Sequence, residues 1–260
     1  MKNKAKYLNP NYPGNWPDKL KTDKFQLFLD YDGTLAPFKD NPDKAHPVDG
    51  TNQVIRNYLK KNIPVTIVTG RNALDIRDNF IKPDIPILGL HGREFLPANQ
   101  NNPTKIGPDI KGIPDELLKY IKKIVDNNPV KLENKDNAYA IHINSNGILQ
   151  ESILKRINNK LKELNSDNWE VISGRKVVEI RFSGWNKADA VKKYRDQNLL
   201  AIYIGDDKTD EDVFNNLNEP GVSIYVKNED ENIDTSANYY LKDPSEVIKF
   251  LKNLLFLSVI

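Results

Sequence analysis

The pattern of apolar and polar residues changes twice along the chain. A short apolar run at 25–29 ends in acidic residues, which is typical of a buried strand. Apolar residues then recur with helical spacing at 54–61, and β-rich runs follow at 64–69 and 85–90. Strands that alternate with helices predict a parallel sheet with helices on both faces.

A different pattern follows a loop rich in Asn, Pro and Gly at 99–112. The elements expected are a helix at 117–125, strands at 130–133 and 138–144, a helix at about 149–164, and strands at 169–172 and 176–182. This order, α-β-β-α-β-β, predicts a small α+β sandwich inserted into the larger domain.

The parallel-sheet pattern then returns, with a helix at 188–196 and an apolar strand at 199–204. We therefore predict an α/β fold with a Rossmann-like parallel-sheet core and an inserted α+β domain. The limits expected are an N-terminal arm at 1–24, a core at 25–112 and 184–260, and the insertion at 113–183. The arm is rich in Lys, Asn and Pro, so we expect it to be loose.

Composition narrows the function classes. Of the 260 residues, 38% are hydrophobic and 28% are charged, which fits a globular protein, and the net charge of +2 gives no reason to expect a nucleic-acid partner. The absence of cysteine excludes disulfides, thiolate metal sites and cysteine nucleophiles. No apolar run approaches the roughly 18 residues of a membrane helix, so we expect a cytoplasmic protein without a membrane partner.

Polar residues stand where three predicted strands end, at 30–34, 69–71 and 206–210. Ligands of open α/β sheets bind outside the carboxyl ends of the strands, so several carboxylates would converge there. Carboxylates at such short distances repel each other, and a bound cation relieves the repulsion. Oxygen ligands without Cys or a His cluster favour Mg²⁺, which binds one or two carboxylates together with substrate phosphate. The substrate predicted is therefore a phosphate ester.

In this interpretation, Asp30 and Asp32 perform two different tasks. Gly33 permits a turn directly after the strand, so Asp32 can face the same cavity as Asp30. One carboxylate can attack phosphorus while the other handles the proton. An isolated Asp-x-Asp is more often a turn or a cap, and the later polar strand ends give this one its weight.

Four segments resemble the ordered motifs of the haloacid dehalogenase superfamily of phosphatases. They are Asp30-Tyr31-Asp32-Gly33-Thr34-Leu35, Thr69 in Val-Thr-Gly-Arg, Lys187 in Gly-Trp-Asn-Lys, and Gly-Asp-Asp-Lys-Thr-Asp-Glu-Asp-Val-Phe at 205–214. Within the superfamily, the fourth motif is similar to that of trehalose-6-phosphate phosphatases. So are the segments 89–94 and 174–181, and Glu133-x-Lys135 followed by His142. Asn134, Asn144 and Asn186 depart from the family pattern.

The resemblance implies a mechanism. Asp30 attacks phosphorus and forms an aspartyl-phosphate, and Asp32 first protonates the sugar oxygen and then deprotonates water. Mg²⁺ is held by the Asp30 carboxylate, the Asp32 carbonyl and the Asp206 carboxylate. Thr69 and Lys187 bind the phosphoryl oxygens.

The resemblance also implies a substrate site. The inserted domain acts as a cap that excludes water. The residues expected to bind substrate are Gly70, Arg71, His91, Glu133, Lys135, His142 and Glu179. Asp207 and Asp210 support the site, and Asp210 orients either Lys187 or a metal-bound water.

The reaction implied is hydrolysis of trehalose 6-phosphate, with a trehalose-6-phosphate synthase as a functional partner. Phosphatases of the same cap type for sucrose 6-phosphate or mannosyl-3-phosphoglycerate are the near alternatives. A phosphohexomutase with this fold is a further one. A non-enzymatic regulator of the synthase is disfavoured because such a protein is expected to have lost motif residues, and here they are present.

Overall fold

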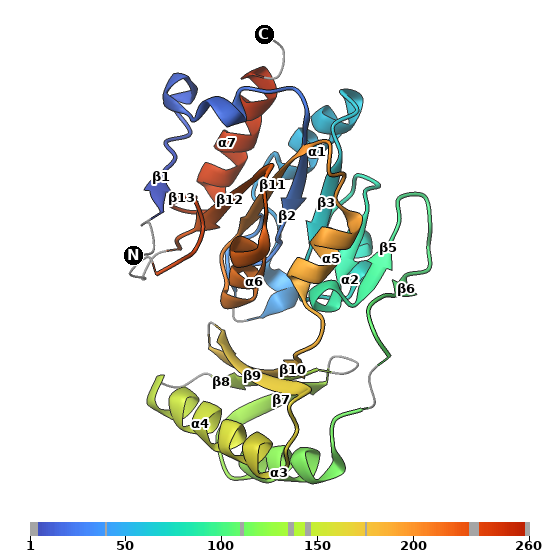
Figure 1. Ribbon diagram of the computed structural model, residues 1–260, viewed down its shortest axis with the longest axis vertical. Coiled ribbons are helices and arrows are strands. Elements are labelled where there is room, and N and C mark those ends of the chain that lie inside the picture. The colour runs from blue at the N-terminus through green and yellow to red at the C-terminus, as the bar shows by residue number, and fades with distance from the viewer. Residues whose placement is uncertain are drawn as a thin grey trace. The chain divides into compact units, whose positions relative to one another are not determined.

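The chain folds into two compact units, each with its own sheet (Figure 1). The computed structural model describes residues 5–39, 41–109, 112–134, 138–143, 147–174, 176–228 and 234–257. The first unit comprises Met1–Ile106 and Lys187–Ile260, and the second is Gly107–Asn186. The role of the second unit as a cap stays a prediction.

The first unit is built on a sheet of nine strands in the order β1-β13-β12-β11-β2-β3-β4-β5-β6. Their bounds are β1 Lys6–Tyr7, β13 Tyr239–Leu241, β12 Gly221–Val226, β11 Leu200–Gly205, β2 Phe25–Leu29, β3 Val65–Val68, β4 Ile87–Gly89, β5 Glu94–Leu96 and β6 Thr104–Lys105. In this order, all neighbours from β1 to β4 pair in parallel. β5 pairs antiparallel with β4 on one side and with β6 on the other. The chain adds β3 and β4 on one side of β2 and β11 to β13 on the other. The carboxyl ends of β2 and β11 therefore meet where the strand order reverses, which is the usual ligand position in such sheets.

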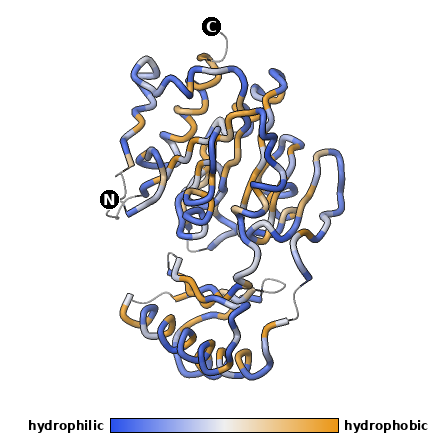
Figure 2. Tube along the Cα trace, in the orientation of Figure 1, coloured by the Kyte–Doolittle hydropathy of each residue, from blue (hydrophilic) through white to orange (hydrophobic). Residues whose placement is uncertain are grey.

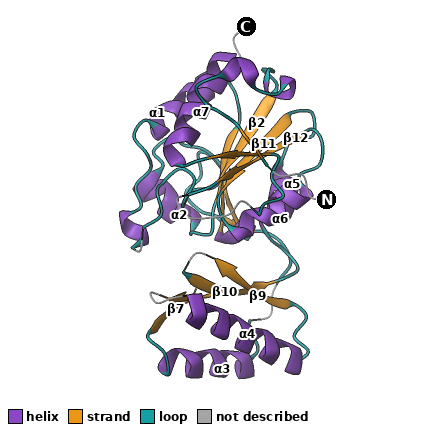
Figure 3. Ribbon diagram, turned by 90° about the vertical axis from the view of Figure 1, so that its left-hand side faces the viewer, coloured by secondary structure: helices purple, strands orange, loops and turns teal. Residues whose placement is uncertain are grey.

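Helices cover both faces of this sheet, as the sequence predicts. Figure 3 shows α1 and α7 on one side of the core strands and α5 and α6 on the other. The helices are α1 Thr51–Lys60, α2 Ala73–Asp75, α5 Lys187–Tyr194, α6 Lys208–Asn216 and α7 Pro244–Leu257, with short turns η1 Pro13–Asn15, η2 Asp18–Leu20, η3 Pro42–Lys44, η4 Ile76–Phe80 and η5 Leu90–Gly92. Among the described residues, no helix is long and apolar enough to cross a membrane.

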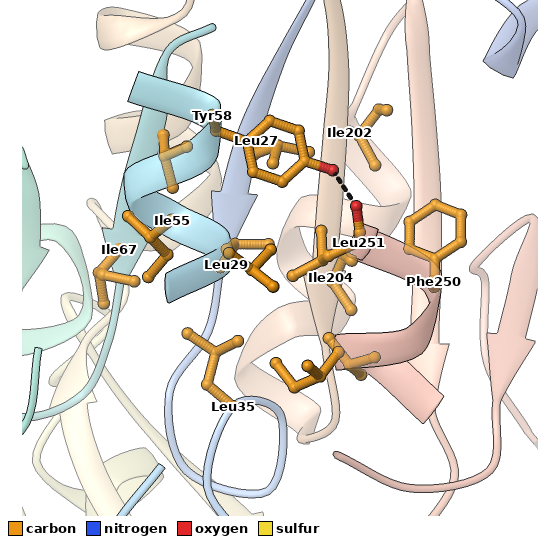
Figure 4. Close-up of a cluster of buried hydrophobic side chains, with 14 of the residues drawn as sticks. Leu27, Leu29, Leu35, Ile55, Tyr58, Ile67, Ile202, Ile204, Phe250 and Leu251 are labelled. Atoms are coloured by element: carbon orange, nitrogen blue, oxygen red, sulfur yellow. Dashed lines mark hydrogen bonds between the residues drawn. The ribbon is translucent and has the colours of Figure 1, made fainter. Parts of the chain in front are cut away.

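The apolar core fixes the central strands in place. Apolar residues gather in the interior strands (Figure 2), and all five residues of β2 are buried. Leu27 and Leu29 belong to the cluster that α1 and α7 cover (Figure 4). There the Tyr58 hydroxyl donates to the carbonyl of Leu251 at 2.6 Å, which joins α1 to α7. Burying one such side chain contributes about 1.5–3 kcal/mol, so this cluster stabilises the central strands whose carboxyl ends carry the polar residues.

The N-terminal segment is part of the core, so the expectation of a loose arm is wrong for its described residues. β1 pairs in parallel with β13 at the edge of the sheet. Trp16 is 3% exposed, and its ring centroid lies 4.7 Å from that of Phe250. The Trp16 indole N–H also donates to the carbonyl of Asn9 at 2.8 Å. The buried residues of this segment are too widely spaced to produce a periodic pattern, so their burial was not visible in the sequence.

The second unit has the expected order of elements. Its antiparallel sheet has the order β7-β8-β10-β9, and two helices pack on one face. The bounds are α3 Asp115–Asp126, β7 Val130–Asn134, β8 Tyr139–Ile143, α4 Gly147–Glu163, β9 Trp169–Gly174 and β10 Val177–Phe182. Ile141 and Ile180 of the sheet and Ile121 and Ile157 of the helices are among the residues of this second core. Alternate residues of the strands therefore point to the opposite face.

Replacing Trp16 by Ala tests the attachment of the N-terminal segment. We expect the variant to lose about 3–5 kcal/mol of the free energy of unfolding, because a large buried ring leaves a cavity. Urea denaturation measures this loss. Tyr12→Ala is the matched control, since Tyr12 is 62% exposed, and it should change stability by less than about 0.5 kcal/mol. Equal small effects of the two substitutions would contradict the packing.

Candidate active site

Asp30 stands directly after β2, where a tight turn begins. Its backbone N–H donates to the carbonyl of Ile204 at 2.9 Å, which continues the pairing of β2 with β11. The residue is 5% exposed. In the turn, Gly33 has a φ of 73°, and a Cβ there would lie 1.9 Å from Oδ2 of Asp206. A glycine is therefore required for the chain to pass so close to the Asp206 carboxylate.

Lys187, the first residue of α5, joins two carboxylates in the interior. Its Nζ lies 2.8 Å from Oδ1 of Asp30 and 2.7 Å from Oδ1 of Asp210. Burial opposes the charge of Lys187, but the Asp210 and Asp30 carboxylates outweigh it and raise the pKa of the ammonium group. Lys187 is therefore a buried cation at the site.

Asp210 is held by several donors. Oδ1 also accepts the Tyr203 hydroxyl at 2.5 Å, and Oδ2 accepts the backbone N–H groups of Asp206 and Asp207, each at 3.0 Å. Asp207 caps α6 and accepts the N–H of Lys208 at 2.6 Å. These contacts favour the first of the two roles expected for Asp210, which is to orient Lys187.

Three carboxylates meet at this point. One oxygen from each of Asp30, Asp206 and Asp210 lies within 4.8 Å of the others. Burial raises the pKa of Asp30 to about 8; Lys187 opposes this shift, and the neighbouring carboxylates add to it. Burial and the charge of Asp30 likewise raise the pKa of Asp206. Such a set of oxygen donors, in excess of the local positive charge, fits a divalent cation.

Arg71 binds Asp32 in this structure. Its Nε and Nη2 atoms donate to the two Asp32 carboxylate oxygens at 2.7 and 2.5 Å. Nη2 also donates to the carbonyl of Pro42 at 2.9 Å. The guanidinium lies over the rings of Tyr31 and Phe80, at 5.2 and 4.8 Å from their centroids. Arg71, which was expected to bind substrate, therefore binds Asp32, which was expected to act as acid and base.

The turn after β3 brings Thr69, Gly70, Arg71 and His91 together. The Thr69 hydroxyl accepts the N–H of Arg71 at 3.1 Å, and the Thr69 carbonyl accepts the N–H of His91 at 2.9 Å. A Cβ on Gly70 would lie 2.5 Å from the His91 ring, so a larger residue here would have to displace that ring. Leu90 and His91 have φ values of 49° and 55°, which are strained for side chains of this size. Such strain is common at functional sites.

Three further residues contact the site, and the sequence analysis gave none of them a role: Thr34 was only part of the first motif, and Tyr203 and Asn228 were missed. Tyr203 bonds to Asp210, and Thr34 and Asn228 contact the Asp206 carboxylate, with the Thr34 hydroxyl 3.4 Å from Oδ1 and the Asn228 amide 3.0 Å from Oδ2. Asn228 follows β12, so the rule that located the other strand ends predicts this position too. Tyr203 was hidden in an apolar run.

The expected substrate residues of the second unit share one sheet face. Glu133 and Glu179 both pair with Ala140, on either side of it, so all three side chains project from the same face. His142 lies two residues beyond Ala140, and its Nε2 is 2.7 Å from Oε2 of Glu133. Glu179 is 5% exposed. Lys135, with Asn144 and Arg175, lies outside the described residues.

The raised pKa of Asp30 gives a pH prediction. The ordinary pKa of an aspartate is 3.8, and that of Asp30 in the folded chain is about 8, so the folded chain binds more protons than the unfolded chain between these limits. Its free energy of unfolding should therefore fall as the pH rises from about 4 to about 8, in chelator that removes divalent cations. Urea denaturation at several pH values should show a smaller fall for Asp30→Asn. Asp23 is exposed, and Asp23→Asn, the control, should show the same fall of the free energy of unfolding with pH as the wild type. An unchanged slope in Asp30→Asn would contradict the electrostatics.

Comparison with known proteins identifies the family. A trehalose-phosphatase family model matches residues 28–245. Trehalose-phosphate phosphatase B of Arabidopsis thaliana is 32% identical over 248 residues, which cover 88% of this chain and 65% of that protein. The probable trehalose-phosphate phosphatase 4 of Oryza sativa subsp. japonica is 30% identical over 250 residues, covering 91% and 67%. The chain thus spans about two thirds of the length of these relatives.

Solved structures share the fold. The C-terminal domain of C. albicans trehalose-6-phosphate phosphatase has a TM-score of 0.83 at 20% identity, over 97% of this chain and 98% of that one. A trehalose-6-phosphate phosphatase related protein has a TM-score of 0.67 at 27% identity, over 90% and 98%. The C-terminal domain of the Candida albicans trehalose synthase regulatory protein has a TM-score of 0.70 at 12% identity, over 95% and 99%. The solved structures show a haloacid dehalogenase-like α/β fold, and the family model that matches residues 28–245 shows that the chain belongs to the trehalose-phosphatase family.

Proposed function

We propose that this chain is a Mg²⁺-dependent phosphatase that hydrolyses trehalose 6-phosphate through an aspartyl-phosphate on Asp30. The observation that carries the proposal is the meeting of Asp30, Lys187 and Asp206 at the carboxyl ends of β2 and β11. Family membership supports the same reaction. The substrate is then a small phosphorylated sugar, and a trehalose-6-phosphate synthase would supply it.

Asp30 is proposed as the nucleophile. Its carboxylate oxygen forms a bond to phosphorus while the bond from phosphorus to the sugar oxygen breaks. Lys187, which already contacts Asp30, would then also stabilise the phosphoryl oxygens, as would Thr69 at the end of β3. Burial keeps Asp30 away from competing water, and this favours attack by the carboxylate.

The cation would be held by the carboxylates of Asp30 and Asp206 and by the backbone carbonyl of Asp32. Oxygen donors of this kind suit Mg²⁺. When bound, Mg²⁺ offsets the negative charge of the carboxylates and of the transferring phosphoryl group. The close contact of Gly33 with Asp206 supports this set, because it keeps the Asp32 peptide next to the Asp206 carboxylate.

Asp32 is proposed as the acid and base. It gives a proton to the sugar oxygen as that group leaves, and it then takes a proton from the water that attacks the aspartyl-phosphate. The second step releases phosphate and restores the Asp30 carboxylate. Both Asp32 oxygens are bonded to Arg71 in this structure, so the proton steps require Asp32 to exchange Arg71 for substrate or water.

The second unit is proposed to act as the cap and to bind the sugar. Its face with Glu133, His142 and Glu179 offers charged acceptors and an imidazole, which suit sugar hydroxyls. Lys135 belongs to the same proposed set, and Gly70, Arg71 and His91 are the proposed substrate residues of the first unit. The alternatives, another capped sugar phosphatase or a phosphohexomutase, use the same nucleophile and differ in the acceptor or sugar.

Phosphate release from a panel of sugar phosphates tests the reaction. We expect turnover of trehalose 6-phosphate with Mg²⁺ and none with excess chelator. Asp30→Asn should lower kcat by at least about 10³-fold, since it removes the nucleophile. Asp23→Asn, the exposed control, should retain wild-type turnover.

The outcomes of this assay separate the parts of the proposal. Turnover of sucrose 6-phosphate or mannosyl-3-phosphoglycerate without turnover of trehalose 6-phosphate would show that the sugar is wrong and the chemistry right. Transfer of phosphate within a hexose phosphate, without release, would favour the mutase. Full activity of Asp30→Asn would overturn the covalent mechanism.

Variants of the second unit test sugar binding. Glu179→Gln and His142→Ala should each raise KM for trehalose 6-phosphate by at least about tenfold, because a charged hydrogen bond to a hydroxyl contributes about 1.5–3 kcal/mol. The kcat for p-nitrophenyl phosphate, which has no sugar, should stay near that of the wild type. Lys162→Ala, at an exposed position of α4, is the control. Equal losses on both substrates would argue against a sugar-binding role.

A further inference from the structure

The loop after β12 places an asparagine against the acidic cluster. Asn228 has a φ of 47°, a backbone region that asparagine adopts more readily than most residues. Its Nδ2 donates to Oδ2 of Asp206 at 3.0 Å and to the carbonyl of Gly33 at 3.1 Å. This one amide group therefore links the segments that follow three neighbouring strands, β2, β11 and β12.

One of these bonds is made to a group of the proposed cation site, and the other to the turn that carries a second proposed ligand. Asp206 supplies one proposed ligand, and the peptide between Asp32 and Gly33 carries the proposed carbonyl ligand. The turn at Gly33 passes so close to Asp206 that a side chain there would overlap the carboxylate. Asn228 therefore fixes Asp206 relative to the Gly33 carbonyl, one peptide beyond the proposed carbonyl ligand of Asp32, and so limits how the two ligands can move apart.

The chemistry of the amide also matters. A lysine at this position would place a second positive charge beside Asp206 and compete with a cation, and an acidic residue would add to the repulsion. An amide donor satisfies one carboxylate oxygen and adds no charge. Residues that hydrogen-bond to ligating carboxylates orient them, and their removal typically lowers metal affinity 10- to 100-fold.

We propose that Asn228 is a positioning residue that orients Asp206 against the turn at Gly33 and thereby raises the affinity of the site for Mg²⁺. The inference rests on the proposed cation site but concerns a residue outside the family motifs considered above. Asn228 touches neither the nucleophile Asp30 nor the lysine Lys187 in the contacts described, so it acts through Asp206.

Asn228→Gly tests the proposal directly. Glycine adopts a positive φ without strain, so the variant loses the amide and keeps the backbone. We expect titration calorimetry of the full chain with MgCl₂ to give a Kd about tenfold higher than that of the wild type, equivalent to about 1.4 kcal/mol. Thermal unfolding in chelator should be unchanged within a few degrees.

A matched control comes from elsewhere in the first unit. Asn62 is exposed, has a φ of 56° and lies after α1, before the amino end of β3. Asn62→Gly makes the same substitution in the same backbone region, away from the carboxyl ends of the strands, and its Kd for Mg²⁺ should equal that of the wild type.

Activity at varied Mg²⁺ gives the second readout. The Mg²⁺ concentration for half-maximal activity should rise with the Kd in Asn228→Gly, and kcat at saturating Mg²⁺ should return to within about twofold of the wild-type value. If the wild type binds Mg²⁺ and Asn228→Gly binds it with the same Kd, the role of Asn228 is overturned and the proposed function stays intact. A wild-type chain that binds no Mg²⁺ would overturn the cation site and this inference with it.

Discussion

The contact of Lys187 with Asp30 and Asp210 is the interaction on which the site depends. Burying an ion costs several kcal/mol unless partners compensate for the lost hydration, and here each partner is itself buried. Lys187 allows two acids to approach each other inside the protein. Asp206 lies next to this group, so three carboxylates and one ammonium leave two negative charges when all are ionised. A divalent cation is the matching counter-charge, and burial together with the repulsion between the carboxylates raises the pKa of both Asp30 and Asp206.

The sheet topology makes this arrangement achievable. β2 and β11 are neighbours in the sheet, although more than half of the chain separates them in sequence. Their registered pairing continues through the N–H of Asp30, so the strand order itself brings Asp30 and Asp206 together. The apolar cluster between the sheet and the helices α1 and α7 packs against both strands. The electrostatic strain of the acidic cluster is thus tolerated because a large apolar core offsets it.

The sequence predicted those features that depend on local pattern and strand order. The α/β core, the inserted α+β unit and the positions of Asp30, Thr69 and Asp206 after their strands all follow from short apolar runs that end in polar residues. It did not predict the burial of Trp16, which depends on a contact with Phe250, distant in the chain. The bond of Arg71 to Asp32 was missed for the same reason: a guanidinium beside a phosphate site can equally bind substrate or a carboxylate, and the choice depends on three-dimensional distances.

The different roles proposed for Asp30 and Asp32 fit the different surroundings of these two identical side chains, which stand two residues apart. The Asp30 side chain is 7% exposed and contacts Lys187, whereas that of Asp32 is 36% exposed and contacts Arg71. A nucleophile benefits from exclusion of water, since hydration lowers the reactivity of a carboxylate. An acid and base must instead reach both the departing oxygen and the incoming water, so it has to lie nearer to solvent. The turn at Gly33 produces this difference, because it carries Asp32 out of the strand while Asp30 stays in register with β11.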